Sequence, residues 1–362
     1  MNPPQRLQSL QALRAIAALG VVLFHTEIGI HAYLPSTATS TLFEWGRQGV
    51  PLFFILSGYV IAHSGLLRPR PTIDFLVGRF ARIYPVYLLL LGLFVACLLI
   101  LPQASFRGDQ AFSWWMLTRS LLFNMGENIG AAGGYIYVGW TLFYEMAFYI
   151  CFSLLIPKFP ETAGTSLFRG LITLALVACA ITRQDLISDF LIGMAIVLLT
   201  EGRRTDTTDI PAIPKPTRPM GDWLNGLSLP NAALAFSMVA AATASLPTAI
   251  CTILIISALA LEQQRPAWFN NRLLLTLGDS SYSIYLVQVF TNSLALKLAM
   301  VLQTKIAPGP IAPGRYAITA VILALSLSSL GGILLRQTVE KPSYRAIENL
   351  WSRWKGRQAL HQ

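Results

Sequence analysis

Ten apolar runs alternate with short polar segments along the 362 residues of this chain. Each run is long enough, or nearly long enough, to cross the roughly 30 Å hydrocarbon layer of a bilayer, and the runs 186–200 and 248–262 are short. This pattern predicts an all-α fold, a polytopic membrane bundle of about ten transmembrane helices with no soluble domain. The predicted helices occupy residues 11–28, 48–65, 84–102, 140–157, 167–182, 186–200, 230–246, 248–262, 280–302 and 316–337.

Two segments interrupt this pattern. The aromatic stretch 112–124 contains Trp114 and Trp115, and tryptophan is typical of the lipid headgroup level. We therefore expect an interfacial or re-entrant piece there. The stretch 201–229 is rich in proline and in charges of both signs, which disfavours a continuous helix. It is predicted to be a cytoplasmic linker.

The composition supports a membrane protein. Hydrophobic residues make up 54% of the chain and charged residues 12%, and the mean hydropathy is +0.56. Soluble domains carry about 25% charged residues. The cysteines lie in apolar runs without paired spacing, so we expect neither disulfides nor a metal site at Cys97, Cys151, Cys179 and Cys251.

The distribution of lysine and arginine predicts the orientation. With a cytoplasmic N-terminus, 19 of the 27 basic residues fall in inside segments and 6 in outside segments, so both termini are predicted to be cytoplasmic. The net charge of +10 then reflects topology and anionic lipid, and no nucleic-acid partner is expected. No cleavage pattern follows the first run, which stays as a span. Residues 1–350 are predicted to form one transmembrane domain, followed by a basic cytoplasmic tail at 351–362.

An ionisable pair lies in the first apolar run. His25 follows Arg14 by eleven residues, and eleven steps of about 100° return to almost the same helix face, roughly 16 Å further along the axis. Ionisable residues at membrane depth are costly to place and indicate a functional site by default. The structural alternative is an arginine that snorkels to the interface and a histidine that bonds to a neighbouring helix.

The second run opens with two glycines and a proline, in the sequence G-R-Q-G-V-P. Such a start lets the backbone leave regular helix and approach a neighbour or a ligand closely. Ser57, Gly58 and Tyr59 follow within the run. They indicate either a ligand contact or a packing face on which Gly58 admits a second helix. No serine nucleophile is expected, because nothing around Ser57 predicts the strand-turn-helix elbow of hydrolases.

Arg79 and Arg82 lie three residues apart at the predicted cytoplasmic end of the third helix, and therefore on one helix face. Two neighbouring guanidinium groups suit a phosphate-bearing ligand. Ordinary positive-inside flanking would also place arginines at this position. The pair is therefore a candidate anion site on the side opposite to His25.

Glu145 lies in the first turns of the fourth predicted helix, which begins at the outer face near Trp140. A carboxylate buried there must be protonated or paired. Glu145 and His25 enter from the same side of the membrane, so a carboxylate–imidazole pair at matched depth is geometrically possible. Such a pair would fix the histidine tautomer and stabilise its protonated form. A structural ion pair between two helices is the alternative.

Taken together and in this order, these motifs resemble the acyltransferase-3 family of integral membrane acyltransferases, and most of all its exopolysaccharide O-acetyltransferases. The resemblance covers almost the whole chain. One departure is Gln288, where the family often has a histidine, so no proton-transfer role is assigned to that position. The matching stretches are Arg14 with His25, G-V-P-L-F-F-I-L-S-G-Y, R-x-x-R-I-x-P from Arg79, W-T-L-x-x-E from Trp140, S-Y-S-I-Y-L from Ser281 and V-E-K-P from Val339.

The resemblance implies transfer of an acetyl group from cytoplasmic acetyl-CoA to a hydroxyl of an extracytoplasmic carbohydrate, namely an exopolysaccharide, an O-antigen or a lipid-linked sugar, in the bacterial inner membrane. Arg79 and Arg82 would bind the CoA phosphates, with Arg14 near the inner mouth of the donor path. His25, oriented by Glu145, would act as general base on the hydroxyl. Further donor contacts are expected at Ser57, Tyr59, Tyr282 and Tyr285, although the last two would serve equally as interfacial anchors.

Several alternatives stay open at this point. The acyl group could rest on His25 before transfer, as an acyl-histidine. A proton-coupled carrier or flippase for a lipid-linked sugar would also place His25 and Glu145 within the membrane, but it would not bind CoA. A non-catalytic scaffold would tolerate the replacement His25→Gln. Acetyl and succinyl groups, and any oligomeric state, are equally compatible with the sequence.

Overall fold

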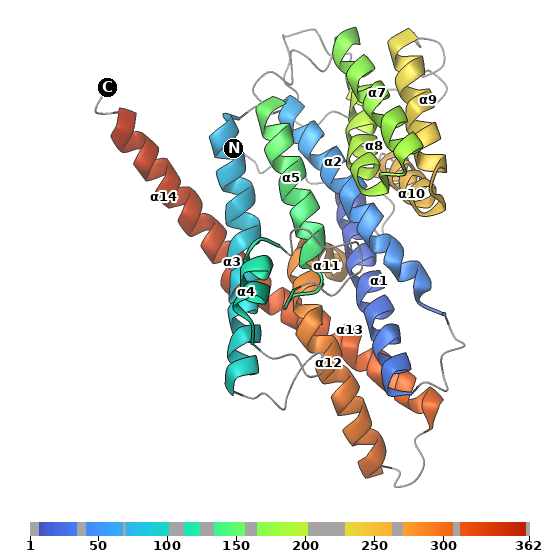
Figure 1. Cartoon of the computed structure of the whole chain (residues 1–362), viewed down its shortest axis with the longest axis vertical. Helices are drawn as coiled ribbons and strands as arrows, with labels where there is room; N and C mark the ends of the chain where they lie inside the picture. The colour runs from blue at the N-terminus through green and yellow to red at the C-terminus, as the bar shows by residue number, and fades with distance from the viewer. Residues whose placement is uncertain are drawn as a thin grey trace. The chain divides into compact units, whose positions relative to one another are not determined.

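The computed structural model describes residues 7–34, 41–67, 70–100, 112–123, 134–155, 165–201, 229–262, 271–306 and 312–359. Within these ranges the regular structure is all helical, as the apolar pattern predicts (Figure 1). In chain order the helices are α1 (Gln8–Tyr33), η2 (Glu44–Gln48), α2 (Gly49–Leu67), α3 (Thr72–Ile100), α4 (Trp114–Leu121), α5 (Gly139–Leu155), α7 (Ser166–Thr182), α8 (Asp185–Glu201), α9 (Leu229–Thr243), α10 (Leu246–Glu262), α11 (Arg272–Asp279), α12 (Ser281–Ile306), α13 (Pro313–Leu335), η7 (Arg336–Glu340) and α14 (Lys341–Ala359).

Several helices have the length and composition of membrane spans. Among the described residues, 5 helices are long and apolar enough to cross a bilayer: Gln8–Tyr33, Glu44–Leu66, Thr72–Ile100, Ser281–Lys305 and Pro313–Gln358. Shorter apolar helices run over Gly139–Leu155, Ser166–Thr182, Leu229–Thr243 and Leu246–Glu262. Ten crossings and cytoplasmic termini stay predictions.

The third helix begins earlier than the apolar run indicates. We predicted a span over 84–102, whereas α3 begins at Thr72 and continues through Pro85. Hydropathy counts the polar residues of this stretch against a span, but polar side chains do not interrupt the backbone hydrogen bonds of a helix. Arg79 and Arg82 therefore lie inside a packed helix, where both are partly buried.

The structure describes most of the aromatic stretch but only the two ends of the predicted linker. The aromatic stretch contains α4, which Ser113 caps and which is too short to cross a bilayer. Trp114 and Trp115 of this helix are 75% and 71% exposed, as an interfacial piece requires. Of the predicted linker, residues 202–228 lie outside the described residues.

The chain forms two compact units. The first unit comprises Met1–Arg14, Val50–Thr72 and Ile150–Leu275, and the second comprises Ala15–Gly49, Ile73–Tyr149 and Thr276–Gln362. The boundary between them falls within α1, α5 and α11 and at the first residue of α2 and of α3. Each unit is built around helices that lie far apart in the sequence.

In the first unit, α7 packs against α8 and α9, and α10 packs against α8 and α9. Two glycines bring α2 and α8 into backbone contact. A Cβ atom on Gly58 would lie 2.1 Å from the carbonyl oxygen of Phe190, and one on Gly193 would lie 2.1 Å from that of Ile55. This contact confirms the packing interpretation of Gly58. At the start of α1, the Glu262 carboxylate accepts hydrogen bonds from the backbone N–H groups of Gln8 and Ser9, at 3.1 and 2.7 Å.

In the second unit, α12 and α13 form a closely packed hairpin. The hydroxyl groups of Thr291 and Ser328 hydrogen-bond across it at 2.6 Å. Near its end, Gly332 lies so close to α12 that a Cβ atom would be 2.8 Å from Ile284 Cα. The hairpin packs against α1 through a cluster of mostly small or aliphatic residues, consisting of Ile30, Leu296, Ala299, Tyr316 and Ala320.

The glycines that open the second apolar run serve contact with α1. A Cβ atom on Gly46 would lie 2.0 Å from the carbonyl oxygen of Gly20, and one on Gly49 would lie 2.5 Å from that of Ala17. The backbone forms the 3₁₀ turn η2 here before regular helix begins. Close approach to a neighbouring helix, one of the two functions predicted for these glycines, is therefore confirmed.

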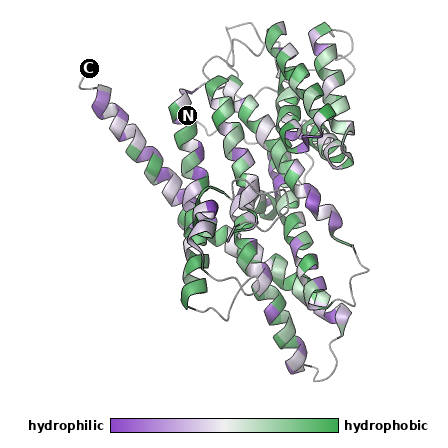
Figure 2. Cartoon of the chain, in the orientation of Figure 1, coloured by the Kyte–Doolittle hydropathy of each residue, from purple (hydrophilic) through white to green (hydrophobic). Residues whose placement is uncertain are grey.

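The outer surfaces of the helices carry many apolar side chains. On α3 these include Leu88, Leu89, Leu93, Leu99 and Ile100, all of them exposed. Figure 2 shows that α7 to α10 are mostly hydrophobic and that α14 is mostly hydrophilic. Such apolar surfaces are typical of helices that face lipid.

Candidate active site

His25 lies in the part of α1 that belongs to the second unit, where its side chain is partly buried. Its ring is held between aromatic neighbours. The Tyr137 ring meets it nearly edge-on, with centroids 4.9 Å apart, and the Phe24 ring lies 5.3 Å away. From α12, the side-chain oxygen Oε1 of Gln288 lies 3.3 Å from His25 Nδ1. Two other segments of the unit therefore position the imidazole.

Gln288 is a site residue to which the sequence assigned no function. It is fully buried, and its Nε2 donates a hydrogen bond to the carbonyl oxygen of Tyr285 at 2.9 Å. One turn further along α12, Asn292 Nδ2 donates to the carbonyl oxygen of Val22 on α1, at 3.3 Å. The signal that could have revealed Gln288 is the departure itself, an amide at a position where the family often has a histidine.

Tyr282 and Tyr285 connect α12 to two other helices. Both are buried, at 9% and 7% exposure. The Tyr282 hydroxyl donates to the carbonyl oxygen of Ile83 on α3, at 2.7 Å, and the Tyr285 hydroxyl hydrogen-bonds with Thr141 Oγ1 on α5, at 2.9 Å. An interfacial anchor keeps its hydroxyl at the headgroup level, so that alternative does not describe them. Their contact with the donor stays a prediction.

Arg79 and Arg82 have different surroundings, although they share one face of α3. The Arg79 guanidinium lies over two rings, 5.1 Å from the centroid of Phe75 and 5.3 Å from that of Tyr149. Such cation–π contacts hold the cation without neutralising it. Arg82 is instead subject to the charges of two carboxylates, first Glu340 and then Glu145. The arginine pair is therefore compensated mainly on the Arg82 side.

Glu145 lies on α5 and is partly buried. It accepts a hydrogen bond from the Tyr149 hydroxyl, and its charge acts on both Arg79 and Arg82. We predicted that Glu145 orients His25, whereas the hydrogen bonds described for the two side chains go to different partners. That orienting role stays a prediction, and the described surroundings place Glu145 with the arginines.

Residues of α12 lie near both His25 and the arginine pair. Gln288 contacts His25, and Tyr282 lies within electrostatic range of Glu145 and Arg82. These two positions on α12 are six residues apart, which is about 9 Å along a helix axis. Tyr285 lies between them and within electrostatic range of both Tyr137 and Glu145.

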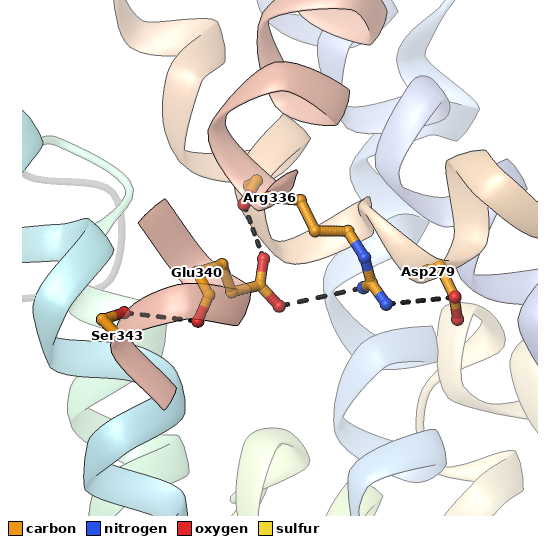
Figure 3. A network of polar contacts seen from close by, with 5 residues as sticks. Asp279, Arg336, Glu340 and Ser343 are labelled. Carbon is orange, nitrogen blue, oxygen red and sulfur yellow. Dashed lines mark hydrogen bonds and ion pairs between the residues drawn. The ribbon is translucent and has the colours of Figure 1, made fainter. Parts of the chain in front are cut away.

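A polar network holds Glu340 beside α12 (Figure 3). The chain between α13 and α14 forms a π-helical turn, Arg336–Glu340, and such turns are frequent at functional sites. Arg336 bridges Asp279 at 3.0 Å and the Glu340 carboxylate at 3.8 Å, while Ser283 donates to the same carboxylate at 2.6 Å. Glu340, only 6% exposed, is thereby held in place, and its charge acts on Arg82.

Arg14, Ser57 and Tyr59 belong to the first unit. Arg14 and Ser57 are partly buried. Tyr59 is buried and its ring stacks on that of His63, with centroids 5.6 Å apart. The structure places His25, Arg79, Arg82, Glu145, Tyr282 and Tyr285 in the second unit instead. Donor contacts at the three residues of the first unit stay predictions.

The second unit thus combines two chemical capacities. A positioned imidazole can accept a proton from a hydroxyl group. In the same unit, a pair of arginines with unequal compensation can attract an anion such as a phosphate. A group-transfer reaction with an anionic donor needs both.

Comparisons with known proteins identify the family of the chain. A family model described as an acyltransferase domain, of the acyltransferase-3 type, matches residues 7–332. The exopolysaccharide production protein ExoZ of Rhizobium meliloti (strain 1021) is 28% identical over 318 residues, which cover 84% of this chain and 91% of that protein. No solved structure matches.

Two further relatives match over shorter stretches. Protein 2 in the picA locus of Rhizobium radiobacter is 40% identical over 107 residues, which are 28% of this chain and 51% of that protein. The acyltransferase MdmB of Streptomyces mycarofaciens is 30% identical over 167 residues, 44% of this chain and 42% of its own length. The chain thus spans about half of the first protein and less than half of the second. Because the family match covers nearly the whole chain, this protein belongs to the acyltransferase-3 family and is an integral membrane acyltransferase.

Proposed function

We propose that this protein transfers an acetyl group from acetyl-CoA, on the cytoplasmic side, to a hydroxyl group of an extracytoplasmic carbohydrate. The observation that carries the proposal is the imidazole of His25, positioned by Gln288 and Tyr137 in the same unit as the arginine pair. A sugar hydroxyl is a poor nucleophile with a very high pKa and needs a base as it attacks. CoA carries several phosphates, which arginine binds well.

The proposed step is direct transfer with His25 as general base. The imidazole accepts the hydroxyl proton while the hydroxyl oxygen attacks the thioester carbonyl carbon. A carbon–oxygen bond forms and the carbon–sulfur bond breaks, and the leaving CoA thiolate takes the proton back from His25. An acyl-histidine route would use the same ring, and labelled acetyl retained on the protein without acceptor would distinguish it.

The acceptor and the location are part of the same proposal. ExoZ, which this chain resembles over most of its length, is described as an exopolysaccharide production protein. We therefore place exopolysaccharide first among the acceptors, before O-antigen and lipid-linked sugars. The bacterial inner membrane, with both termini in the cytoplasm, gives acetyl-CoA access to the arginines from inside and the carbohydrate access to His25 from outside.

The surroundings of the two arginines predict that they differ in donor binding. Arg79 is held by aromatic rings and Arg82 is countered by Glu340, so Arg79 is the principal phosphate contact in this proposal. Thermal unfolding of the purified protein in lipid nanodiscs should show a higher Tm with CoA. In Arg79→Met this increase should be lost, whereas Arg82→Met should lower the Tm of the unliganded protein more than Arg79→Met does.

The control for this experiment is dephospho-CoA, which lacks one phosphate and should protect the wild type less. Equal protection of the wild type and of the double variant Arg79→Met/Arg82→Met would contradict the phosphate site. Absence of any protection by CoA would favour a carrier of lipid-linked sugar instead.

Glu145 is proposed to act on the donor site through Arg79, Arg82 and Tyr149. Glu145→Gln removes the charge and keeps the shape and an acceptor for the Tyr149 hydroxyl. We expect the KM for acetyl-CoA to change about tenfold or less, as for one charge in a shared network, with a smaller change in kcat. Initial rates against acetyl-CoA concentration measure both. A loss of kcat at unchanged KM would instead support the predicted orienting role toward His25.

A further inference from the structure

We propose that Gln288 fixes the tautomer of His25, so that Nδ1 carries the hydrogen and Nε2 holds the lone pair that accepts the hydroxyl proton. The tautomer follows from the hydrogen bonds alone. That Nε2 accepts the hydroxyl proton rests on the proposed function. Gln288 is thus a positioning residue that acts through His25.

Two hydrogen bonds fix the orientation of the Gln288 amide. Its two terminal atoms face different partners: one lies 2.9 Å from the carbonyl oxygen of Tyr285, and the other lies 3.3 Å from His25 Nδ1. A backbone carbonyl oxygen can only accept a hydrogen bond. The atom that faces it must therefore be the NH₂ group, because a flipped amide would set two acceptor oxygens against each other. The side-chain oxygen Oε1 is left facing the histidine.

The orientation of the amide in turn selects the tautomer of His25. An amide oxygen has no hydrogen to donate, so the bond between Oε1 and Nδ1 exists only when Nδ1 carries the hydrogen. In the neutral ring this leaves the lone pair on Nε2. The imidazolium also has a hydrogen on Nδ1, so the same hydrogen bond persists when Nε2 accepts a proton. Gln288 therefore disfavours only the neutral form in which Nε2 is already protonated.

The surroundings of Gln288 and His25 stabilise this hydrogen bond. Gln288 is fully buried, so water does not compete for its oxygen. The Tyr137 and Phe24 rings limit rotation of the imidazole. In water either neutral tautomer forms freely, and the protein selects the one that can act as base at Nε2. A neutral amide does so without placing a second charge beside the ring.

The tautomer is measurable without activity. The chain has 4 histidines, so ¹⁵N-histidine labelling in nanodiscs gives few signals, and the signals lost in His25→Ala assign the ring of interest. At a pH where the ring is neutral, we expect a protonated Nδ1 and an unprotonated Nε2 in the wild type. Gln288→Met, which has a similar size and no acceptor oxygen, should shift the ring toward the other tautomer and lower kcat by at most roughly 10²- to 10⁴-fold, the contribution of a general base, with little change in the KM for acetyl-CoA.

Two further variants separate tautomer control from packing. Gln288→Glu restores an acceptor and should return Nδ1 to the protonated form. Asn292→Leu removes the neighbouring bond from α12 to α1 without touching the ring, and it should leave the tautomer unchanged. A protonated Nε2 in the neutral wild-type ring, or an unchanged tautomer in folded Gln288→Met, would overturn the inference. If the tautomer is as proposed and His25→Ala keeps full transfer, the role of His25 in the proposed function fails and the tautomer assignment stands.

Discussion

His25→Ala is expected to abolish acetyl transfer while leaving CoA binding intact. A positioned general base contributes about 10²- to 10⁴-fold to a rate, and a sugar hydroxyl is a poor nucleophile unless a base accepts its proton as it attacks. Binding of the CoA phosphates is assigned to Arg79 and Arg82, which lie on α3 and not on the helix of His25. The rate of thiol release from acetyl-CoA, by membranes of a deletion strain complemented with each variant, measures the transfer.

The matched control is His31→Ala on the same helix. His31 lies six residues beyond His25 and is also partly buried, so the variant tests for a general effect of removing a histidine from α1. It should retain transfer. His25→Ala with a normal rate would remove the base from the proposed mechanism, whereas parallel loss of CoA protection would indicate misfolding and not loss of chemistry.

Gly46→Ala is expected to have the largest effect on stability. The added Cβ atom would lie 2.0 Å from the carbonyl oxygen of Gly20 and 2.6 Å from its carbonyl carbon. Because both are backbone atoms, the strain cannot be relieved by rotating a side chain, and α1 must move away from η2. Overpacking of cores costs about 1–3 kcal/mol and occasionally more, and we expect the upper end or beyond. A lower Tm and poor recovery of folded protein from nanodiscs are the measurements.

Gly92→Ala provides the matched control. Gly92 lies within α3, and a Cβ atom there meets nothing within 4 Å. Alanine is favoured over glycine in a helix interior by about 0.5–1 kcal/mol, so this variant should be neutral or slightly stabilising. If Gly46→Ala were as stable as Gly92→Ala, the backbone contact between η2 and α1 would be wrong.

The apolar pattern predicted the helical class and the region of most helices, because hydrophobic length is a property of the sequence alone. The apolar run began at residue 84, whereas α3 begins at Thr72, because hydropathy does not detect the polar first turns of a helix. The turn at Arg336–Glu340 could not be predicted either, because its shape depends on the bonds from Ser283 and Asp279, which lie far away in the chain.

The sequence predicted candidate residues of the site but not the contacts among them. Spacing placed Arg79 and Arg82 on one face, and the cost of a buried imidazole identified His25. The contact of Gln288 with His25 joins positions 263 residues apart, and periodicity contains no information on such pairs. The family resemblance indicated no function for Gln288, because the family often has a histidine at this position and this chain does not.

Transfer of an acetyl group from acetyl-CoA to a surface carbohydrate depends, in the proposed mechanism, on His25 as general base. Mass analysis of surface glycans from cells that carry the intact protein, compared with cells that carry His25→Ala at equal expression, tests it most directly. We expect an acetyl ester on a glycan hydroxyl of the first cells and its loss in the second. Identical acylation profiles in the two strains would rule out His25 as the base.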